Sequence, residues 1–240
     1  MATDILVSEL ERLYKVSAGK PEIVRVPETS FVMIDGHGDP NTSQDYKDAI
    51  EALYALSYTL TFALKNEQEL QYRVGPLESL WWAEDMSAFD LERKGDWNWT
   101  MMIAQPDAVT VDRFELAREE ARRKKQLPAI ARARLERFEE GACAQVLHVG
   151  PFSAEGPTIR ELHAFIHEQG YSFDGKLQKH HEIYLSDPRR SAPESGRRSS
   201  ASPSPARDPP LRLAPTNGRR IPGSPERRRD SWQEGRAGWC

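Results

Sequence analysis

Residues 31–64 read FVMIDGHGDPNTSQDYKDAIEALYALSYTLTFAL and contain a strand, a loop and a long helix in that order. The apolar residues 31–36 predict a strand, and the glycines and proline of 36–40 predict a loop. Thr42 and Asp45 have the spacing of a capping box, which predicts the start of a helix. Apolar and small residues then follow at intervals of three and four, which is typical of the buried face of a helix: Ile50, Leu53, Ser57, Leu60 and Leu64.

This order of elements occurs twice in the chain. The first unit is completed by predicted strands at 22–26, 72–84 and 96–105, and a charged helix over 111–125, capped by Thr110, follows it. The second unit has predicted strands at 142–149, 171–173 and 180–186 and a helix over 157–169 that ends at Gly170. We therefore expect an α+β fold: a duplicated strand–helix–strand–strand unit with pseudo-two-fold symmetry, helices on one face of the sheets and a ligand cleft on the other.

Composition excludes several classes of protein. The 240 residues carry 33 Lys and Arg against 37 Asp and Glu, a balance that does not favour nucleic-acid binding. Acidic residues interrupt the N-terminal apolar residues, so no signal peptide is expected, and the best apolar stretch, 52–64, is too short and polar for a membrane span. Two cysteines give no disulfide framework. We expect a soluble cytoplasmic protein whose partner is a small molecule and not a membrane or nucleic acid; the sequence does not indicate its oligomeric state.

The chain also divides by composition. We expect an N-terminal extension over 1–19, a folded domain over 20–194 and a disordered tail over 195–240. The tail is rich in Arg, Pro and Ser and has few large apolar residues, so burial could not offset the entropy of ordering it. A basic docking arm is the alternative, but solvated low complexity explains the composition better. Its residue types are those of an alternative reading frame in a GC-rich gene, so we suspect a frameshift near Glu194, and folding should then not depend on 195–240.

Strand alternation selects the first candidate site residues. In residues 180–186, His-His-Glu-Ile-Tyr-Leu-Ser, the apolar Ile183 and Leu185 share one face of the strand. If that face meets the helices, His180, Glu182 and Tyr184 point into the cleft. A carboxylate in the middle of a strand is unfavourable by strand propensity. Its presence indicates either that this face of the strand is solvated or that the carboxylate has a functional role. A solvated face and a functional site explain the pattern equally well.

Tryptophans give the second signal. Trp81 and Trp82 lie in one predicted strand, and Trp97 and Trp99 lie in the next. Rings in such positions either stack on flat ligands or anchor the core. We expect Trp82 and Trp99 to form the walls of the cleft, with Trp81 and Trp97 as further candidates. Glu78 precedes the first pair and would add negative potential.

Four separated segments resemble one family. They are residues 32–40, VMIDGHGDP; 77–84, LESLWWAE; 97–101, WNWTM; and 179–190, KHHEIYLSDPRR. Together they look like a stand-alone GyrI-like small-molecule-binding domain, over about residues 15–194. The resemblance implies the doubled fold and ligand cleft, with Glu182 as the cleft carboxylate. It also implies one of three functions: effector or drug binding, gyrase inhibition, or hydrolysis of cyclopropanoid genotoxins.

The long tryptophan and histidine motifs look most like the hydrolase subgroup. In that case Glu182 would deprotonate a water that opens the cyclopropane, and Tyr184 would donate a hydrogen bond to the substrate or to Glu182. No metal or cofactor is expected, because His163 and His167 at one helical spacing are more typical of polar surface than of a metal site. A passive binding protein or a gyrase-inhibitor-like protein remains the alternative.

Overall fold

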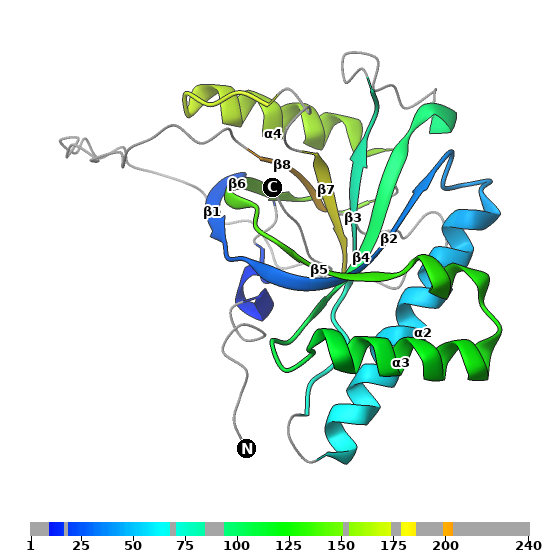
Figure 1. Cartoon of the computed structure of the whole chain (residues 1–240). Helices are drawn as coiled ribbons and strands as arrows, with labels where there is room; N and C mark the ends of the chain where they lie inside the picture. Colours follow the sequence, from blue (N-terminus) through cyan, green and yellow to red (C-terminus); the bar gives the residue numbers. More distant parts are fainter. Residues whose placement is uncertain are drawn as a thin grey trace, which may run out of the picture.

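The computed structural model describes residues 10–16, 19–67, 71–84, 94–150, 154–173, 179–185 and 199–203, the last by backbone alone. Figure 1 shows how its strands and helices are arranged. The strands are β1 (Glu22–Val26), β2 (Thr29–His37), β3 (Leu77–Trp82), β4 (Asn98–Gln105), β5 (Arg134–Phe138), β6 (Gly141–Leu147), β7 (His180–Tyr184) and β8 (Ser199–Pro203). The helices are α2 (Gln44–Asn66), α3 (Val111–Lys125) and α4 (Gly156–Glu168), with 3-10 turns η2 (Lys94–Asp96) and η3 (Pro128–Arg132).

All eight described strands form one hydrogen-bonded antiparallel sheet in the order β1-β6-β8-β7-β3-β4-β2-β5. The order is symmetric about the central β7–β3 pair, since β6-β8-β7 on one side mirrors β2-β4-β3 on the other. The edges follow the same symmetry: β1 leads into β2 but pairs with β6, whereas β5 leads into β6 but pairs with β2. The predicted duplication with a pseudo-two-fold axis is therefore confirmed.

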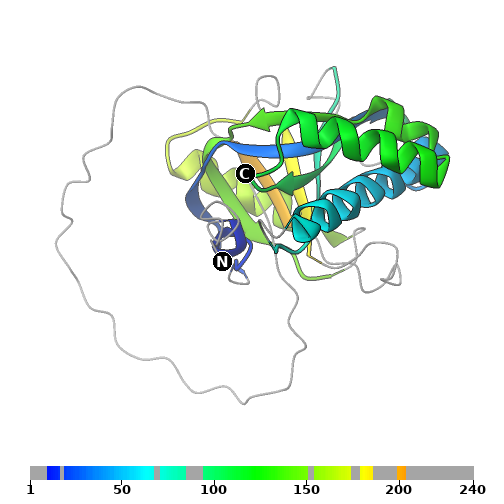
Figure 2. The same ribbon diagram turned by 60° about the horizontal axis from the view of Figure 1, so that its bottom comes forward.

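Helices α2 and α4 pack on the same face of this sheet, which we call the helix face. Helix α3 lies alongside α2 (Figure 2). The apolar side of α2 packs on Val32 and Ile34 of β2 and on their neighbours in β4. Helix α4 packs Leu162 and Ile166 on Val146 of β6. The two helices thus cover opposite halves of one face, as expected.

Local signals place the helix ends. Ser43 caps α2 by accepting a hydrogen bond from the Tyr46 amide (3.2 Å), so the cap is one residue later than the predicted Thr42. Thr110 caps α3 as predicted, accepting from the Arg113 amide (3.3 Å). Gly170, just after α4, has a φ of 79°, a backbone conformation that favours glycine.

The second unit differs from the prediction in two strands. Residues 171–173 form no strand, and the unit is completed by β8, which lies between β6 and β7. β8 falls inside the segment 195–240, so the prediction that this segment carries no regular structure is wrong for Ser199–Pro203. Residues 204–240 and the suspected frameshift position lie outside the described residues. The edge strand β5 was also not predicted.

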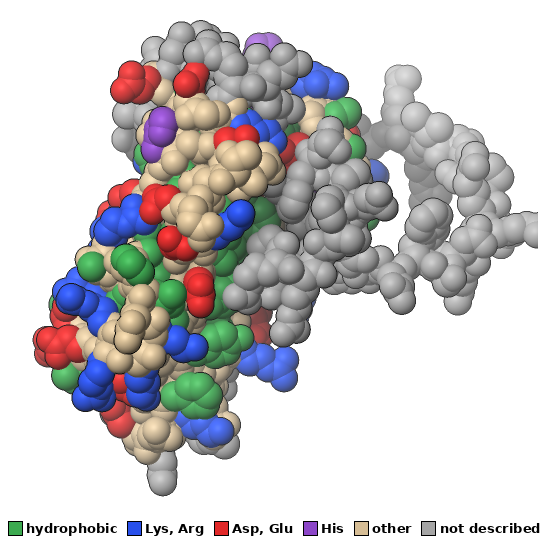
Figure 3. All heavy atoms as spheres, turned by 90° about the vertical axis from the view of Figure 1, so that its right-hand side faces the viewer, with side chains coloured by type: hydrophobic (Ala, Val, Ile, Leu, Met, Phe, Trp, Pro, Cys, Tyr) green, Lys and Arg blue, Asp and Glu red, His purple; other side chains and the backbone are tan. Residues whose placement is uncertain are grey.

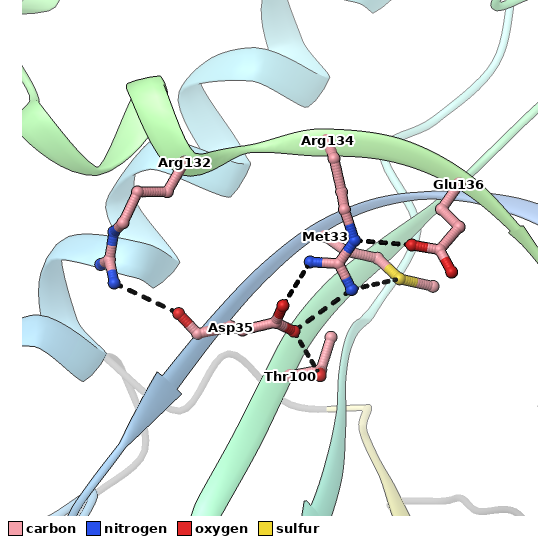
Figure 4. Close-up of polar contacts among 6 residues, drawn as sticks. All are labelled: Met33, Asp35, Thr100, Arg132, Arg134 and Glu136. Carbon is pink, nitrogen blue, oxygen red and sulfur yellow. Dashed lines mark hydrogen bonds and ion pairs between the residues drawn. The ribbon is translucent and has the colours of Figure 1, made fainter.

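An exposed polar network ties β5 to its neighbours (Figure 4). Asp35 of β2 accepts from Thr100 Oγ1 of β4 (2.6 Å) and from an Arg134 guanidinium nitrogen of β5 (2.7 Å). Arg134 Nε also donates to Glu136 (2.6 Å), and Arg132 donates to the Asp35 carbonyl (3.2 Å). Exposed ion pairs contribute about 0–1 kcal/mol each, so the network fixes the register of the edge strand more than it stabilises the fold.

The surface over α2 and α3 mixes acidic, basic and apolar side chains (Figure 3). Exposed apolar residues there include Phe62 and Leu116, which are 61% and 69% accessible. Scattered exposed apolar residues are normal for a globular domain. Within the described ranges, no helix has the length and apolar character to cross a membrane.

Candidate functional site

Glu182 lies at the centre of the sheet, between the two helices. A row of paired backbone positions crosses the strands from β6 to β2, with the Ser200 backbone of β8 linking β6 to β7. The side chains along this row therefore share one face of the sheet: Val146, Glu182, Ser79, Met101 and Ile34. Helix α4 covers the Val146 end of this row, and α2 covers the Ile34 end. Glu182 therefore projects onto the helix face, next to the pseudo-two-fold axis.

The Glu182 carboxylate is surrounded by hydrogen-bond donors. Its Oε2 accepts from the Tyr184 hydroxyl (2.7 Å) and from Trp81 Nε1 (3.2 Å). Because Tyr184 donates its proton to Glu182, Ser79 Oγ donates in turn to the Tyr184 oxygen (2.9 Å). None of these four side chains is more than 3% exposed. Charge-assisted hydrogen bonds of this kind stabilise the buried carboxylate and hold it in one orientation.

His180 approaches the other carboxylate oxygen. Its Nε2 lies 3.5 Å from Glu182 Oε1, and both side chains are almost fully buried. His180 pairs with Trp81 across the β7–β3 ladder, so it is also on the helix face. The structure thus brings together four of the residues that the sequence predicted: Glu182, Tyr184, His180 and Trp81.

An aromatic cluster borders this group. Trp81 lies 5.9 Å from Tyr46 of α2 and 5.5 Å from Trp97, measured between ring centroids. Trp99 meets Tyr46 edge to face at 5.4 Å. Trp99 is fully buried, and its indole lies so close to Gly36 that a Cβ there would be 2.1 Å from the ring. Trp99 is therefore part of the core packing beside the site.

The face on which Glu182 and Tyr184 lie is opposite to the one predicted. The sequence argument placed the apolar Ile183 and Leu185 against the helices. In the structure Ile183 packs on Cys143 and Val26, under Leu13 and Tyr14 of residues 10–16. β7 is buried on both faces, so alternation identifies which residues share a face but not which face carries the helices.

Two other candidates lie away from Glu182, on the face opposite the helices. Trp82 packs beside Leu80 and Met33 there, with Lys179 Nζ 3.3 Å above its ring centroid. Glu78 is also on this opposite face, because it alternates with Ser79. The expectation that Trp82 and Glu78 border the same cleft as Glu182 is therefore wrong.

Glu78 belongs to a separate buried cluster. It accepts a hydrogen bond from the Tyr14 hydroxyl (2.7 Å) and lies 3.1 Å from His181 Nε2, an ion-pair contact. His181 Nδ1 lies 2.9 Å from Glu140. Burial alone would lower the pKa of His181, but Glu140 and Glu78 outweigh it and raise the pKa to about 10. His181 is therefore an imidazolium between two carboxylates, and Tyr14 ties residues 10–16 to it.

A cavity of about 220 Å³ lies next to this cluster. Leu10 and Tyr14 form one side of it, residues 72–76 another, and Ala104 to Pro106 at the end of β4 the third. It has no lining residue in common with the Glu182 group. As for metals, the described parts of the chain contain no group of three His, Cys, Asp or Glu side chains placed to hold an ion.

Sequence reasoning missed one residue of the Glu182 group. Ser79 was passed over between two more conspicuous neighbours, although alternation with Trp81 could have placed it on the same face. His163 of α4 was interpreted as polar surface, and the residue is exposed in the structure.

Comparison with known proteins identifies the family. The model of the GyrI-like small-molecule-binding domain matches residues 19–197. An uncharacterised conserved protein from Listeria innocua is 41% identical, with a TM-score of 0.75 over 82% of this chain and 98% of its own. A structure described as a hydrolase from Listeria innocua is 38% identical, with a TM-score of 0.70 over 82% and 98%.

A third similar structure is the hydrolase encoded by lin2189 of Listeria innocua, at 40% identity and a TM-score of 0.72 over 82% of this chain and 97% of that one. Among curated proteins none matches this sequence. The doubled fold, the family match over most of the chain and these similarities agree. The chain belongs to the GyrI-like small-molecule-binding domain family.

Proposed function

We propose that the protein binds flat, lipophilic small molecules beside Glu182 and hydrolyses cyclopropanoid genotoxins by adding water to the cyclopropane. One observation carries the proposal. Tyr184 and Trp81 both donate hydrogen bonds to Oε2 of the buried Glu182 carboxylate, and Oε1 faces His180. A carboxylate placed in this way is suited to accept a proton from a bound water. Two relatives at 38% and 40% identity are described as hydrolases, which supports this reaction class.

The reaction needs little from the protein beyond a base and orientation. The water oxygen bonds to the cyclopropane CH₂ carbon, the strained C–C bond breaks, and its electron pair moves into the conjugated dienone to give a phenolate. Glu182 takes the proton that the water loses. General-base assistance of this kind contributes about 10²–10⁴-fold, and orientation of the water against the strained carbon contributes further.

The aromatic residues beside Glu182 supply the affinity. Trp81 and Trp97 contact each other next to the carboxylate, whereas Trp82 lies on the opposite face. The neighbouring rings suit a flat conjugated ligand, since aromatic pairs contribute about 0.5–1.5 kcal/mol beyond area burial. Trp81 is therefore a better candidate for the ligand-facing ring than Trp82.

The test is incubation with a cyclopropanoid and detection of a product heavier by one water. Glu182→Gln keeps the shape and removes the base, so hydrolysis should fall at least tenfold while ligand binding persists. Glu161→Gln on the exposed side of α4 is the matched control and should hydrolyse at the wild-type rate. Tight binding without any water-adduct product in the wild-type protein would favour a passive binding or sequestering role. Wild-type turnover in Glu182→Gln would exclude Glu182 as the base.

A further inference from the structure

The cavity of about 220 Å³ lies at the end of β4, and none of its lining residues belongs to the Glu182 group. Three segments that are distant in sequence form its walls: Leu10 to Tyr14, residues 72–76, and Ala104 to Pro106. Leu10 is buried, and its carbonyl accepts a hydrogen bond from the Tyr14 amide (2.8 Å), so a helical turn holds the first wall in place. The cavity is therefore a place where three parts of the fold meet without filling the space between them.

The residues at the ends of the strands explain why this space stays open. Pro106 follows the last residue of β4, and Gly75 and Pro76 lead into β3. Their side chains are absent or confined to a ring, and a Cβ added at Gly75 would meet no heavy atom within 4 Å. Voids larger than a water molecule are few in a protein domain. A cavity of this volume is thus large enough to hold a ligand.

The polar side chains inside the cavity already have hydrogen-bond partners. The Tyr72 hydroxyl donates to Gln105 Oε1 (3.1 Å), and the Tyr14 hydroxyl donates to Glu78 (2.7 Å). Gln105 Nε2 donates in turn to Ser57 Oγ of α2 (3.1 Å). A bound molecule would therefore meet carbon atoms and the faces of two tyrosine rings, and it would not need to supply hydrogen bonds.

We propose that this cavity is a second small-molecule site and that it takes a neutral aromatic molecule of one or two rings. An apolar cavity of about 150 Å³ admits benzene, so the larger volume here has room for a two-ring molecule such as indole. The charged residues of the lining, Glu11 and Arg73, are exposed. A charged ligand would thus lose its hydration inside without gaining an ion pair, which favours a neutral one. The proposal does not depend on the proposed function of Glu182.

Indole binding followed by NMR of methyl groups tests the site. In the wild-type protein, the methyl signals of Ala104 and Val74 should shift and saturate as indole is added, whereas the signal of Ala117, buried under α3, should not. Ala104→Leu fills part of the cavity and should weaken the binding reported by Val74 at least tenfold. Ala164→Leu adds the same side chain at an exposed position of α4, so it is the matched control and should bind indole as the wild type does.

Glu182→Gln separates this site from the proposed catalytic one. The indole-induced shifts of Ala104 and Val74 should be the same in this variant as in the wild type, whether or not the wild type hydrolyses a cyclopropanoid. Should Ala104→Leu not fold, Val74→Phe fills the cavity from another wall, and Ala104 then reports the binding. Signals of Ala104 and Val74 that do not move in indole would overturn the proposal. Undiminished binding in the filled variant, or shifts that disappear in Glu182→Gln, would overturn it as well.

Discussion

Replacing His181 should destabilise the fold strongly, because its imidazolium is the only cation in contact with Glu78 and Glu140 among the described residues. The ring lies 2.9 Å from Glu140 and 3.1 Å from Glu78, and all three side chains are at most 4% exposed. His181→Gln keeps a polar side chain but leaves two buried carboxylates with no positive charge between them. Breaking a buried ion pair in this way typically costs about 3–5 kcal/mol.

The pKa of His181 gives a similar magnitude. It rises from 6.5 to about 10 in the folded protein. Each unit corresponds to about 1.4 kcal/mol, so at pH 7 the raised pKa contributes about 4 kcal/mol. Because the folded-state pKa is the higher one, this contribution is complete below pH 6.5 and is lost as the pH rises to about 10.

The assay is urea unfolding followed by the fluorescence of the buried tryptophans at several pH values between 6 and 10. The wild-type free energy of unfolding should fall over this range, and His181→Gln should lack that part of the slope. Should His181→Gln not fold, the triple variant with Gln also at 78 and 140 removes the buried charges and should fold. His167→Gln controls for loss of an exposed histidine. An unfolding free energy for His181→Gln within about 1 kcal/mol of wild type at pH 7 would refute the reasoning.

Three further changes test other parts of the structure. Gly36→Ala places a Cβ 2.1 Å from the Trp99 ring, so the indole must move. The free energy of unfolding measured in urea should therefore fall by about 1–3 kcal/mol. Gly95→Ala is the control, because its Cβ would enter open space and should leave the free energy of unfolding unchanged. Tyr184→Phe removes the hydroxyl that donates to Glu182, so product formation, followed by mass, should slow. The free energy of unfolding from thermal melts should change by only about 1 kcal/mol. An unchanged rate would show that the hydroxyl does not orient the base. A chain ending after Glu194 lacks β8 and should melt at a lower temperature than one ending after Pro203; equal melting temperatures for the two chains would mean that β8 adds nothing to the sheet.

Elements whose determinants are local were predictable from sequence. Helix α3 begins and ends where the sequence indicates, because Thr110 caps it and a run of basic residues completes its last turn. The strand β8 was not predictable, since Ser199–Pro203 reads SSASP and has no strand propensity. Its place depends on pairing with β6 and β7, which are distant in sequence, and composition arguments do not detect such pairing.

The grouping of side chains on β7 was predictable from sequence, but the face of the sheet that carries them was not. Alternation correctly grouped His180, Glu182 and Tyr184, and the register with β3 then adds Ser79 and Trp81. The face could not be assigned, because Ile183 is buried as deeply on its side as Tyr184 is on the other. An apolar residue such as Ile183 shows that its face of the strand is covered. It does not show whether the helices or residues 10–16 cover that face.

The paired histidines of β7 explain why the central strands carry polar residues on both faces. His180 and Glu182 point to the helix face, where Tyr184 holds the buried carboxylate that we propose as the base. His181, between them in sequence, points to the opposite face and neutralises Glu78 and Glu140. The two clusters thus lie back to back across the β7–β3 pair. It follows that changes at 181 should act first on folding and changes at 180 and 182 first on turnover, although the residues are adjacent in the chain.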